Sequence, residues 1–441
     1  MSAPEVQIPA GTLRGRGLPD GCAAFLGVPY AAPPVGALRY AEPQEAAAWD
    51  GTRDATAFGP PAPQPERTLA GLDTRSFMGP RWTGEDPQLT LNVWTPAADG
   101  PHPVMVWMHG GAFVAGSPAA PCYDGAAFAR DGIVLVTVTY RLGAEGFLAL
   151  DGGVTNAGIR DQLAALQWVQ REIAAFGGDT GNVTAFGQSA GAMTLGALLA
   201  SPVSRGLVHR AALQSGGQNV ILSAEQGARV AAAVAGHLGV EPTADAFRAV
   251  PIADVIAAQA KVLPGTVDLQ TDSDADPAFG MLQLLPVRDG DVVPHDPLAA
   301  VSGRAGSDVP LLIGDTTEEG NLYVAGSPDV DLAHAVPLTR SLFRDPIAAL
   351  ADAHRASGAP TFVYEFAWPS GALGGRLGAA HAVELPFVFD TLDAPGLRGD
   401  AALLGDAGGP PELAARMHGA WVAFARGGDP GWPADAAEVF A

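Results

Sequence analysis

The chain has 441 residues, of which 48% are hydrophobic and 16% charged, so it can bury a large core and does not have the composition of a disordered protein. Its formal net charge of −22 repels phosphate backbones and anionic lipid surfaces, which argues against a nucleic-acid partner. No uninterrupted apolar run reaches the roughly 18 residues that a membrane-spanning helix needs, so we expect no membrane insertion.

Two further features bear on the compartment and the source of the chain. The first five residues, MSAPE, lack the basic stretch and apolar run of a signal peptide. The two cysteines, Cys22 and Cys122, are too few for a disulfide framework or a cysteine-based metal site. We therefore expect a cytoplasmic protein with free thiols, although the sequence leaves open whether the two cysteines pair. A composition rich in Ala, Gly, Pro and Arg, with Lys261 as the only lysine, favours a bacterial source.

Short β-branched runs and helical segments alternate along the chain. Runs of this kind without polar alternation suit strands that are buried on both faces, and their alternation with helices predicts a large, mostly parallel α/β sheet flanked by helices. Apolar residues at helical spacing predict a helix over about 163–176, which Gly177 and Gly178 end. The expected strands are, in chain order, residues 104–107, 133–140, 183–186, 211–213, 310–313 and 361–366.

The stretch from about residue 222 to residue 300 has a different character. It is rich in alanine, helical in its pattern, and broken by Pro251, Pro264 and Pro286. No internal repeat stands out along the chain. We therefore interpret this stretch as a helical insertion over the active site, within a single domain that spans residues 1–441.

The strongest local motif is GQSAG at residues 187–191. It follows the expected strand 183–186 and precedes an apolar, alanine-rich segment at 192–200. Such a strand–turn–helix context indicates a nucleophile elbow, in which small neighbours let the backbone turn tightly around an exposed serine. Without this context the same motif is an ordinary turn. Ser189 is therefore the candidate nucleophile.

A second glycine motif, HGGAF at residues 109–113, follows the expected strand 104–107. Glycines at this place let backbone N–H groups face a cavity, where they can stabilise the oxyanion that forms when a serine attacks an ester. Alone, the motif could be a flexible turn after a strand. Next to a nucleophile elbow, it indicates an oxyanion hole.

Together with other segments, the two motifs form a pattern that resembles the type-B carboxylesterase family, which includes bacterial para-nitrobenzyl esterases and the cholinesterases. The resemblance covers nearly the whole chain. It implies an α/β-hydrolase fold and ester hydrolysis through an acyl-enzyme, with no cofactor and no metal. The matching segments are residues 25–36, 38–40, 85–86, 91–94, 109–113, 123–125, 139–143, 146–148, 161–162, 168–169, 176–179, 187–191, 214–216, 421, 424–425 and 428–430.

The resemblance also assigns the other two members of a catalytic triad. The acid of the family is a glutamate that precedes a glycine after a buried strand, which is Glu319 here, with Glu318 as the alternative. The family's histidine corresponds to His381 in the segment GAAHAVELPFVF at 378–389. The order Ser, acid, His is that of the α/β-hydrolase fold. The other histidines after Glu319 are expected to be solvated, in the case of His334 and His354, or a satisfied helix residue, in the case of His418.

By the same resemblance, the oxyanion donors are the backbone N–H groups of Gly111, Ala112 and Ala190. Gln188 stands where the family commonly has a glutamate, which removes a negative charge beside the serine and puts a preference for cationic substrates in doubt. Ser215 is either a hydrogen-bonding neighbour of the triad or plain packing. The residues Phe113, Leu322 and Tyr323 line a substrate pocket or belong to the core.

These observations predict a serine carboxylesterase that acts on small-molecule esters with small or short-chain acyl or aryl groups. One alternative is a catalytically silent binding protein of the same fold, which the presence of all three triad residues disfavours. Another is a hydrolase or transferase for amide or thioester acyl groups, which the triad by itself does not exclude. No amphipathic lid pattern favours an interfacial lipase.

Overall fold

The computed structural model describes residues 3–66, 68–97, 99–217, 220–263, 265–294 and 296–441. Within these residues, ten strands form one sheet in the order β13-β12-β11-β10-β9-β7-β8-β6-β4-β3. The strands from β13 to β8 pair in parallel, and β6, β4 and β3 continue the sheet with antiparallel pairs. The strands are β3 (Arg16–Gly17), β4 (Ala23–Pro29), β6 (Thr90–Thr95), β7 (His102–Met108), β8 (Val134–Val138), β9 (Gly178–Gln188), β10 (Arg210–Gln214), β11 (Leu311–Thr316), β12 (Thr361–Phe366) and β13 (Ala437–Phe440).

The mostly parallel α/β sheet that the sequence predicts is confirmed. Each of the six segments expected to be strands overlaps one of the strands from β7 to β12. The expected helix is α4 (Ala157–Glu172), which begins earlier than predicted and ends in a 3-10 turn, Ile173–Phe176. Gly177 terminates this turn with a φ of 79°, a left-handed conformation that glycine adopts without a steric cost. A separate three-stranded sheet joins β1 (Glu5–Ile8), β2 (Gly11–Arg14) and β5 (Thr52–Asp54).

Both faces of the central sheet are buried, which explains why its strands carry apolar residues at successive positions. On β7, Val104, Val106 and Met108 face one hydrophobic cluster, whereas Met105 and Trp107 face another. Side chains alternate between the faces of a strand, so a strand covered on both sides needs apolar residues throughout.

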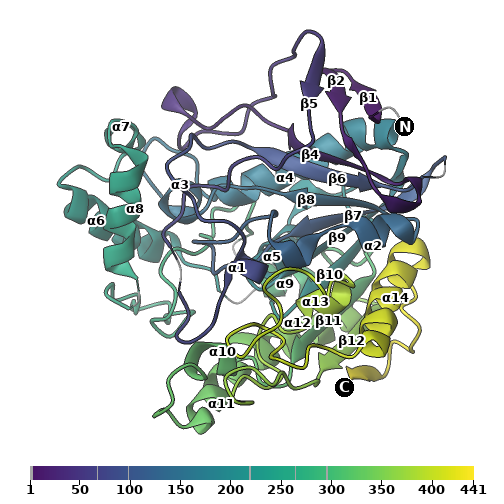
Figure 1. Cartoon of the computed structure of the whole chain (residues 1–441). Coiled ribbons are helices and arrows are strands. Elements are labelled where there is room, and N and C mark those ends of the chain that lie inside the picture. Colours follow the sequence, from purple (N-terminus) through teal and green to yellow (C-terminus); the bar gives the residue numbers. More distant parts are fainter. Residues whose placement is uncertain (1–2, 67, 98, 218–219, 264, 295) are drawn as a thin grey trace.

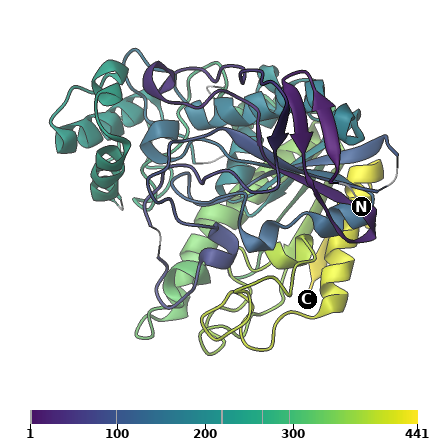
Figure 2. The same ribbon diagram turned by 45° about the horizontal axis from the view of Figure 1, so that its top comes forward.

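Helices on each side of the sheet supply the two clusters (Figures 1 and 2). The first cluster contains residues of α4, α5 (Ala190–Ala200), α9 (Pro297–Ser302) and α12 (Asp345–Ala356). The second contains residues of α2 (Ala126–Arg130), α13 (Leu385–Val388) and α14 (Pro411–Gly427). Among the described helices, none is long and apolar enough to cross a membrane.

Outside the segment 222–300, the remaining described helices are short. They are η1 (Pro19–Gly21), η2 (Gly36–Leu38), α1 (Arg75–Met78), η3 (Pro121–Tyr123), α3 (Gly143–Phe147), η5 (Pro202–Ser204), α10 (Asn321–Val324), η6 (Leu332–His334), α11 (Ala335–Leu338) and the π-helical turn η7 (Thr339–Arg344). The two cysteines, Cys22 and Cys122, are buried free thiols.

The segment 222–300 begins as the helical insertion that the sequence predicts. It contains α6 (Ala224–Leu238), α7 (Ala244–Arg248) and α8 (Ile252–Val262), and α6 starts with a capping box between Ser223 and Gln226. After Val262 the described residues are irregular up to α9. In Figures 1 and 2 the three helices protrude on the side of the molecule opposite to the two chain ends.

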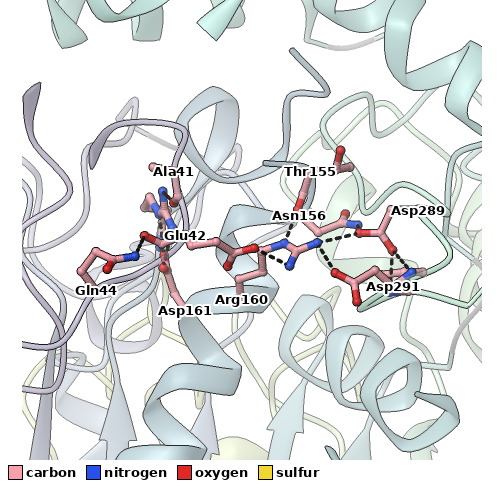
Figure 3. Close-up of polar contacts among 11 residues, drawn as sticks. Ala41, Glu42, Gln44, Thr155, Asn156, Arg160, Asp161, Asp289 and Asp291 are labelled. Carbon is pink, nitrogen blue, oxygen red and sulfur yellow. Dashed lines mark hydrogen bonds and ion pairs between the residues drawn. The ribbon is translucent and has the colours of Figure 1, made fainter. Parts of the chain in front are cut away.

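A polar network fastens this insertion to α4 (Figure 3). The guanidinium of Arg160 on α4 pairs with Asp291 at 2.8 Å and with Glu42 of the N-terminal region at 2.6 Å. The side-chain amide of Asn156, just before α4, donates to Asp289 at 2.8 Å, and its oxygen accepts the N–H of Val287 at 2.8 Å. Because Arg160 and Asn156 bind residues from distant parts of the sequence, they fix where the insertion attaches.

Candidate active site

Ser189 lies between the end of β9 and the start of α5 and has the backbone of a nucleophile elbow. Its φ of 55° and ψ of −124° are rare for a residue with a side chain and cost about 1–3 kcal/mol. The neighbouring glycines allow the turn: a Cβ on Gly191 would lie 2.0 Å from the carbonyl oxygen of Met108, and one on Gly187 would lie 2.7 Å from Gly191. The GQSAG motif therefore forms the strand–turn–helix predicted for it.

The HGGAF segment lies beside this elbow, directly after β7. Gly111 has a φ of 126°, and a Cβ there would lie 1.9 Å from the carbonyl oxygen of Ala115. Gly110, Gly111 and Ala112 line the same pocket as Ser189. Within the described part of the chain, no acceptor binds the backbone N–H groups of Gly111, Ala112 or Ala190. Unpaired N–H groups next to a serine can stabilise negative charge that develops on a substrate oxygen.

His381 and Glu319 form a close buried pair. Glu319 follows β11, and His381 lies in the loop between β12 and α13. The distance from His381 Nδ1 to Glu319 Oε2 is 2.5 Å, and Glu319 Oε1 accepts the N–H of Thr316 at 2.8 Å. A carboxylate in this place keeps the proton on Nδ1 and leaves Nε2 with a lone pair that can accept a proton.

Glu318, the alternative acid, binds elsewhere. Its Oε2 accepts the backbone N–H of Ala379 at 2.8 Å, and its own N–H donates to the carbonyl of the same residue at 3.0 Å. Glu318 thus holds the loop that carries His381, whereas Glu319 contacts the imidazole ring itself.

Ser189 and His381 line one narrow pocket of about 40 Å³. Two of the three residues that the sequence offers for a substrate pocket, Leu322 and Tyr323, also line it. The third, Phe113, is fully buried in the core, where its ring packs against Phe147 with centroids 5.2 Å apart. Phe113 has a φ of 64°, and its ring belongs to the first hydrophobic cluster.

Part of the pocket wall comes from a region that carries no recognisable motif. Leu69, Thr74, Phe77 and Met78 line the pocket, but no described residue of 222–300 does. The insertion was expected over the active site. Instead, α8 packs beside α3, where the side-chain oxygen of Gln259 accepts the N–H of Ala144 at 2.7 Å.

In this structure the Nε2 atom of His381 faces Gln188 and not Ser189. The distance between Gln188 Nε2 and His381 Nε2 is 3.0 Å. The Ser189 hydroxyl has no hydrogen-bond partner within the described residues and opens onto the pocket. Apart from the position of Gln188 before the serine, no feature of the sequence predicts this contact.

Glu384 is a second buried carboxyl group that sequence reasoning did not single out. Burial, and then the charge of Glu319, raise the pKa of Glu384 to about 8. Its Oε1 accepts a hydrogen bond from the side-chain amide of Gln214 at 3.4 Å, and its Oε2 has no partner within the described residues. A glutamate inside the apolar run ELPFVF was the available signal, because charged residues are rarely buried without a partner.

The other candidates have structural positions. His334 is exposed, as expected, but His354 is fully buried and not solvated, because its ring binds the Thr361 hydroxyl at 2.8 Å. His418 is held by the carbonyl of Val388 at 2.8 Å and by Asp131 at 3.1 Å. The Ser215 hydroxyl is buried and has no partner within the described residues.

Comparisons with known proteins agree with this geometry. A family model described as "Carboxylesterase family" matches residues 2–336. The phenmedipham hydrolase of Pseudarthrobacter oxydans is 37% identical over 473 aligned residues, which cover 98% of this chain and 91% of that protein. The para-nitrobenzyl esterase of Bacillus subtilis (strain 168) is 35% identical, and the alignment covers 94% and 89% of the two chains.

Solved structures show the same fold. A PNB esterase superimposes with a TM-score of 0.83 at 33% identity and covers 98% of this chain and 92% of its own. A carboxylesterase of Geobacillus stearothermophilus gives a TM-score of 0.81 at 33% identity, with coverage of 99% and 96%. The chain therefore belongs to the carboxylesterase family, has an α/β-hydrolase fold and is a carboxylic-ester hydrolase.

Proposed function

We propose that Ser189, His381 and Glu319 are the catalytic triad of this esterase. The observation that carries the proposal is the strained backbone of Ser189 at the wall of a pocket that it shares with His381. The 2.5 Å contact between His381 and Glu319 supports it further. Strain of this kind persists where the surrounding structure holds a functional side chain in place.

In the proposed mechanism, His381 takes the Ser189 proton on Nε2 while the serine oxygen attacks the ester carbonyl. Glu319 stabilises the imidazolium that forms. The imidazolium then gives its proton to the leaving alcohol, and the acyl group stays on Ser189. Water attacks this acyl-enzyme with His381 as the base, which releases the acid and restores the serine.

We assign the stabilisation of the oxyanion in each tetrahedral intermediate to the backbone N–H groups of Gly111, Ala112 and Ala190. All three are backbone donors, so Ala112 serves as well as a glycine would. Their lack of acceptors within the described residues supports this role. Each such donor contributes about 3–4 kcal/mol to transition-state stabilisation in other serine hydrolases.

The size of the pocket supports a small acyl group. A volume of about 40 Å³ has room for roughly three water-sized groups. Thr74 and Met78 also line an adjoining outer depression of about 660 Å³, which contains Arg75, Arg81 and Trp82. We assign the narrow pocket, with Leu322 and Tyr323 in its wall, to the acyl group and the outer depression to the alcohol part of the ester.

The test is hydrolysis of p-nitrophenyl acetate, butyrate and octanoate by the wild type and by Ser189→Ala. The wild type should prefer the acetate, and Ser189→Ala should lose at least about 10⁴-fold in kcat because the nucleophile is gone. Ser302→Ala, an exposed serine on α9, is the matched control and should keep the wild-type rate. An unchanged rate in Ser189→Ala would eliminate the assigned nucleophile.

The same assay separates the alternatives. Turnover of a p-nitroanilide or thioester at rates above those of the esters would point to amide or thioester chemistry. A chain that turns over none of them and resists a fluorophosphonate probe at Ser189 would be a silent binding protein. We also propose that the protein acts in a reducing, cytoplasmic setting, which the two buried free thiols support.

A further inference from the structure

We propose that Gln188 is a positioning residue that occupies the Nε2 lone pair of His381 in the free enzyme and keeps the imidazole uncharged. This proposal rests on the proposed function, because it concerns the residue assigned as the general base. It goes further, since it gives the side chain before the nucleophile a role in setting the pH range of the reaction.

The Gln188 side chain lies between Gly110 and His381. Gln188 is the last residue of β9, which pairs with β10 on one side and with β7 on the other, and the residue is buried. Its Oε1 lies beside the backbone of Gly110, because a Cβ added to Gly110 would lie 2.5 Å from this oxygen. With the oxygen turned to Gly110, the NH₂ group faces His381 Nε2 at 3.0 Å.

The protons fix the direction of this hydrogen bond. The Nδ1 proton of His381 points to Glu319 at 2.5 Å, so Nε2 of the neutral ring carries a lone pair and accepts the proton of the amide. The Ser189 hydroxyl needs the same lone pair, because Nε2 is the atom that takes its proton. Gln188 and Ser189 therefore compete for one atom, and Gln188 holds it in this structure.

The contact distinguishes the charge states of the ring. If Nε2 carried a proton, its N–H would face the N–H of the amide, and two donors at 3.0 Å repel each other. A hydrogen bond to the neutral form of a group disfavours the charged form. Gln188 therefore favours the neutral imidazole until the substrate arrives, when the amide yields Nε2 to Ser189.

The other groups around the ring do not replace this effect. The rings of Tyr323 and Phe343 flank the imidazole, with centroids 6.1 Å and 4.7 Å away. Among the charged or titratable groups nearby, Glu319 contacts Nδ1, and Glu384 and Asp315 interact with Glu319. Arg344 pairs with Asp315. Glu318 binds the loop of His381, and Tyr123 lies in the pocket wall. Within the described residues, only Gln188 makes a hydrogen bond to Nε2.

The test measures kcat/KM as a function of pH in the wild type, Gln188→Met and Gln188→Glu. It compares the acid limb, the low-pH range in which kcat/KM rises as His381 loses its proton. A carboxylate next to Nε2 stabilises the imidazolium, so Gln188→Glu should move the limb to higher pH by about 1–3 units. Methionine has a similar length but no donor, so Gln188→Met should move the limb upward by less. Gln44→Glu, an exposed residue, adds the same charge far from the ring and should leave the limb in place.

A merely structural role would give a different result. It would lower the rate of Gln188→Met by the same factor at every pH and leave the limb where the wild type has it. Limbs of both Gln188 variants that coincide with the wild-type limb would overturn the proposal. If Gln188→Glu does not fold, Gln188→Met decides.

A second measurement separates this proposal from the proposed function. In the Ser189→Ala background, an NMR titration of the His381 ring needs no catalysis. The titration should move to higher pH when Gln188→Met is added, because the donor to Nε2 is then lost. A movement there, together with full activity of Ser189→Ala, would refute the triad and keep the role of Gln188. No movement would refute the role of Gln188, whatever the activity.

Discussion

The two ends of helix α5 border two cavities of opposite character. At its N-terminal end, Ser189, Gln188 and His381 line a pocket of about 40 Å³. Toward its C-terminal end, Leu195, Leu198 and Leu199 line a larger cavity of about 210 Å³, which is mainly apolar. The catalytic triad proposed above lies at the smaller cavity, so on this assignment cavity size is a poor guide to the active site. Backbone strain and converging polar groups mark the site better.

The two ends also have complementary energetic roles. All eleven residues of α5 are buried, and burial of an apolar side chain contributes about 1.5–3 kcal/mol. The C-terminal half therefore anchors the helix in the core, and this anchoring offsets the strain of about 1–3 kcal/mol at Ser189. We expect substitutions at the N-terminal end to change activity and substitutions at the C-terminal end to change stability.

The largest effect should come from the polar end. Glu319→Gln keeps the shape of the side chain but removes the charge that orients His381, so we expect kcat to fall by roughly 10⁴-fold, which corresponds to about 5 kcal/mol. Glu318→Gln should lose much less, because Glu318 binds the backbone of Ala379 and not the ring. Steady-state kinetics with p-nitrophenyl acetate measure both. Equal losses in the two variants would contradict the assignment of the acid.

The next effect belongs to the apolar end. Leu198→Ala enlarges a cavity that already exists, so it should lower the free energy of unfolding by about 2–5 kcal/mol. Because Leu198 is remote from the polar groups of the candidate site, kcat should stay within about twofold of the wild type. Urea unfolding and kinetics on the same sample test this pair of expectations. A large loss of kcat at full stability would show that the two ends are coupled.

The sequence predicted the features of this helix that depend on local pattern. The GQSAG motif between a β-branched run and an alanine-rich run has only a few sterically allowed conformations, since the Cβ clearances at Gly187 and Gly191 are too small for other residues. The family resemblance then supplied His381 and Glu319, which no local pattern joins to Ser189.

The features that the sequence did not predict depend on packing between distant segments. The pocket wall from Leu69 to Met78 is an irregular stretch apart from α1, and its residues carry no periodicity that would place them over Ser189. Likewise, Phe113 is apolar and follows the glycine motif, so pocket and core are equally compatible with its chemistry. The Arg160 and Asn156 contacts that fix the insertion beside α4 join residues more than a hundred positions apart.

A third prediction concerns a buried acid at the polar side. The pKa of Glu384 is raised to about 8, against about 4.3 for an ordinary glutamate. Between these values the unfolded chain has released the proton and the folded chain has kept it, so the stability contributed by this group falls as the pH rises. The stability contributed by the Glu384 carboxyl group is fully present below about pH 4 and is lost by about pH 8, at about 1.4 kcal/mol per pH unit.

Glu384→Gln should therefore flatten this slope, because glutamine stays uncharged and fills the same volume. At pH 5 the variant and the wild type should be similar in stability, and at pH 8 the variant should be the more stable. Unfolding by urea at both pH values checks the sign. A wild type that gains stability relative to the variant as the pH rises would contradict the raised pKa.

The smallest effect should come from filling the apolar cavity. Ala211 on β10 lines this cavity, whereas the next residue, Ala212, faces the other side of the sheet and is fully buried in the second cluster. Ala211→Val adds methyl groups where space exists and suits a strand, so we expect a gain of about 0.5–1 kcal/mol. Ala212→Val makes the same change in a filled region and should cost about 1–3 kcal/mol.

Because the two residues are adjacent, the unfolded chains of the variants are nearly identical, and the difference in their unfolding free energies reports the space on each face. Equal effects of the two substitutions would mean that the cavity closes in solution, and the apolar end would then be as tightly packed as the rest of the core.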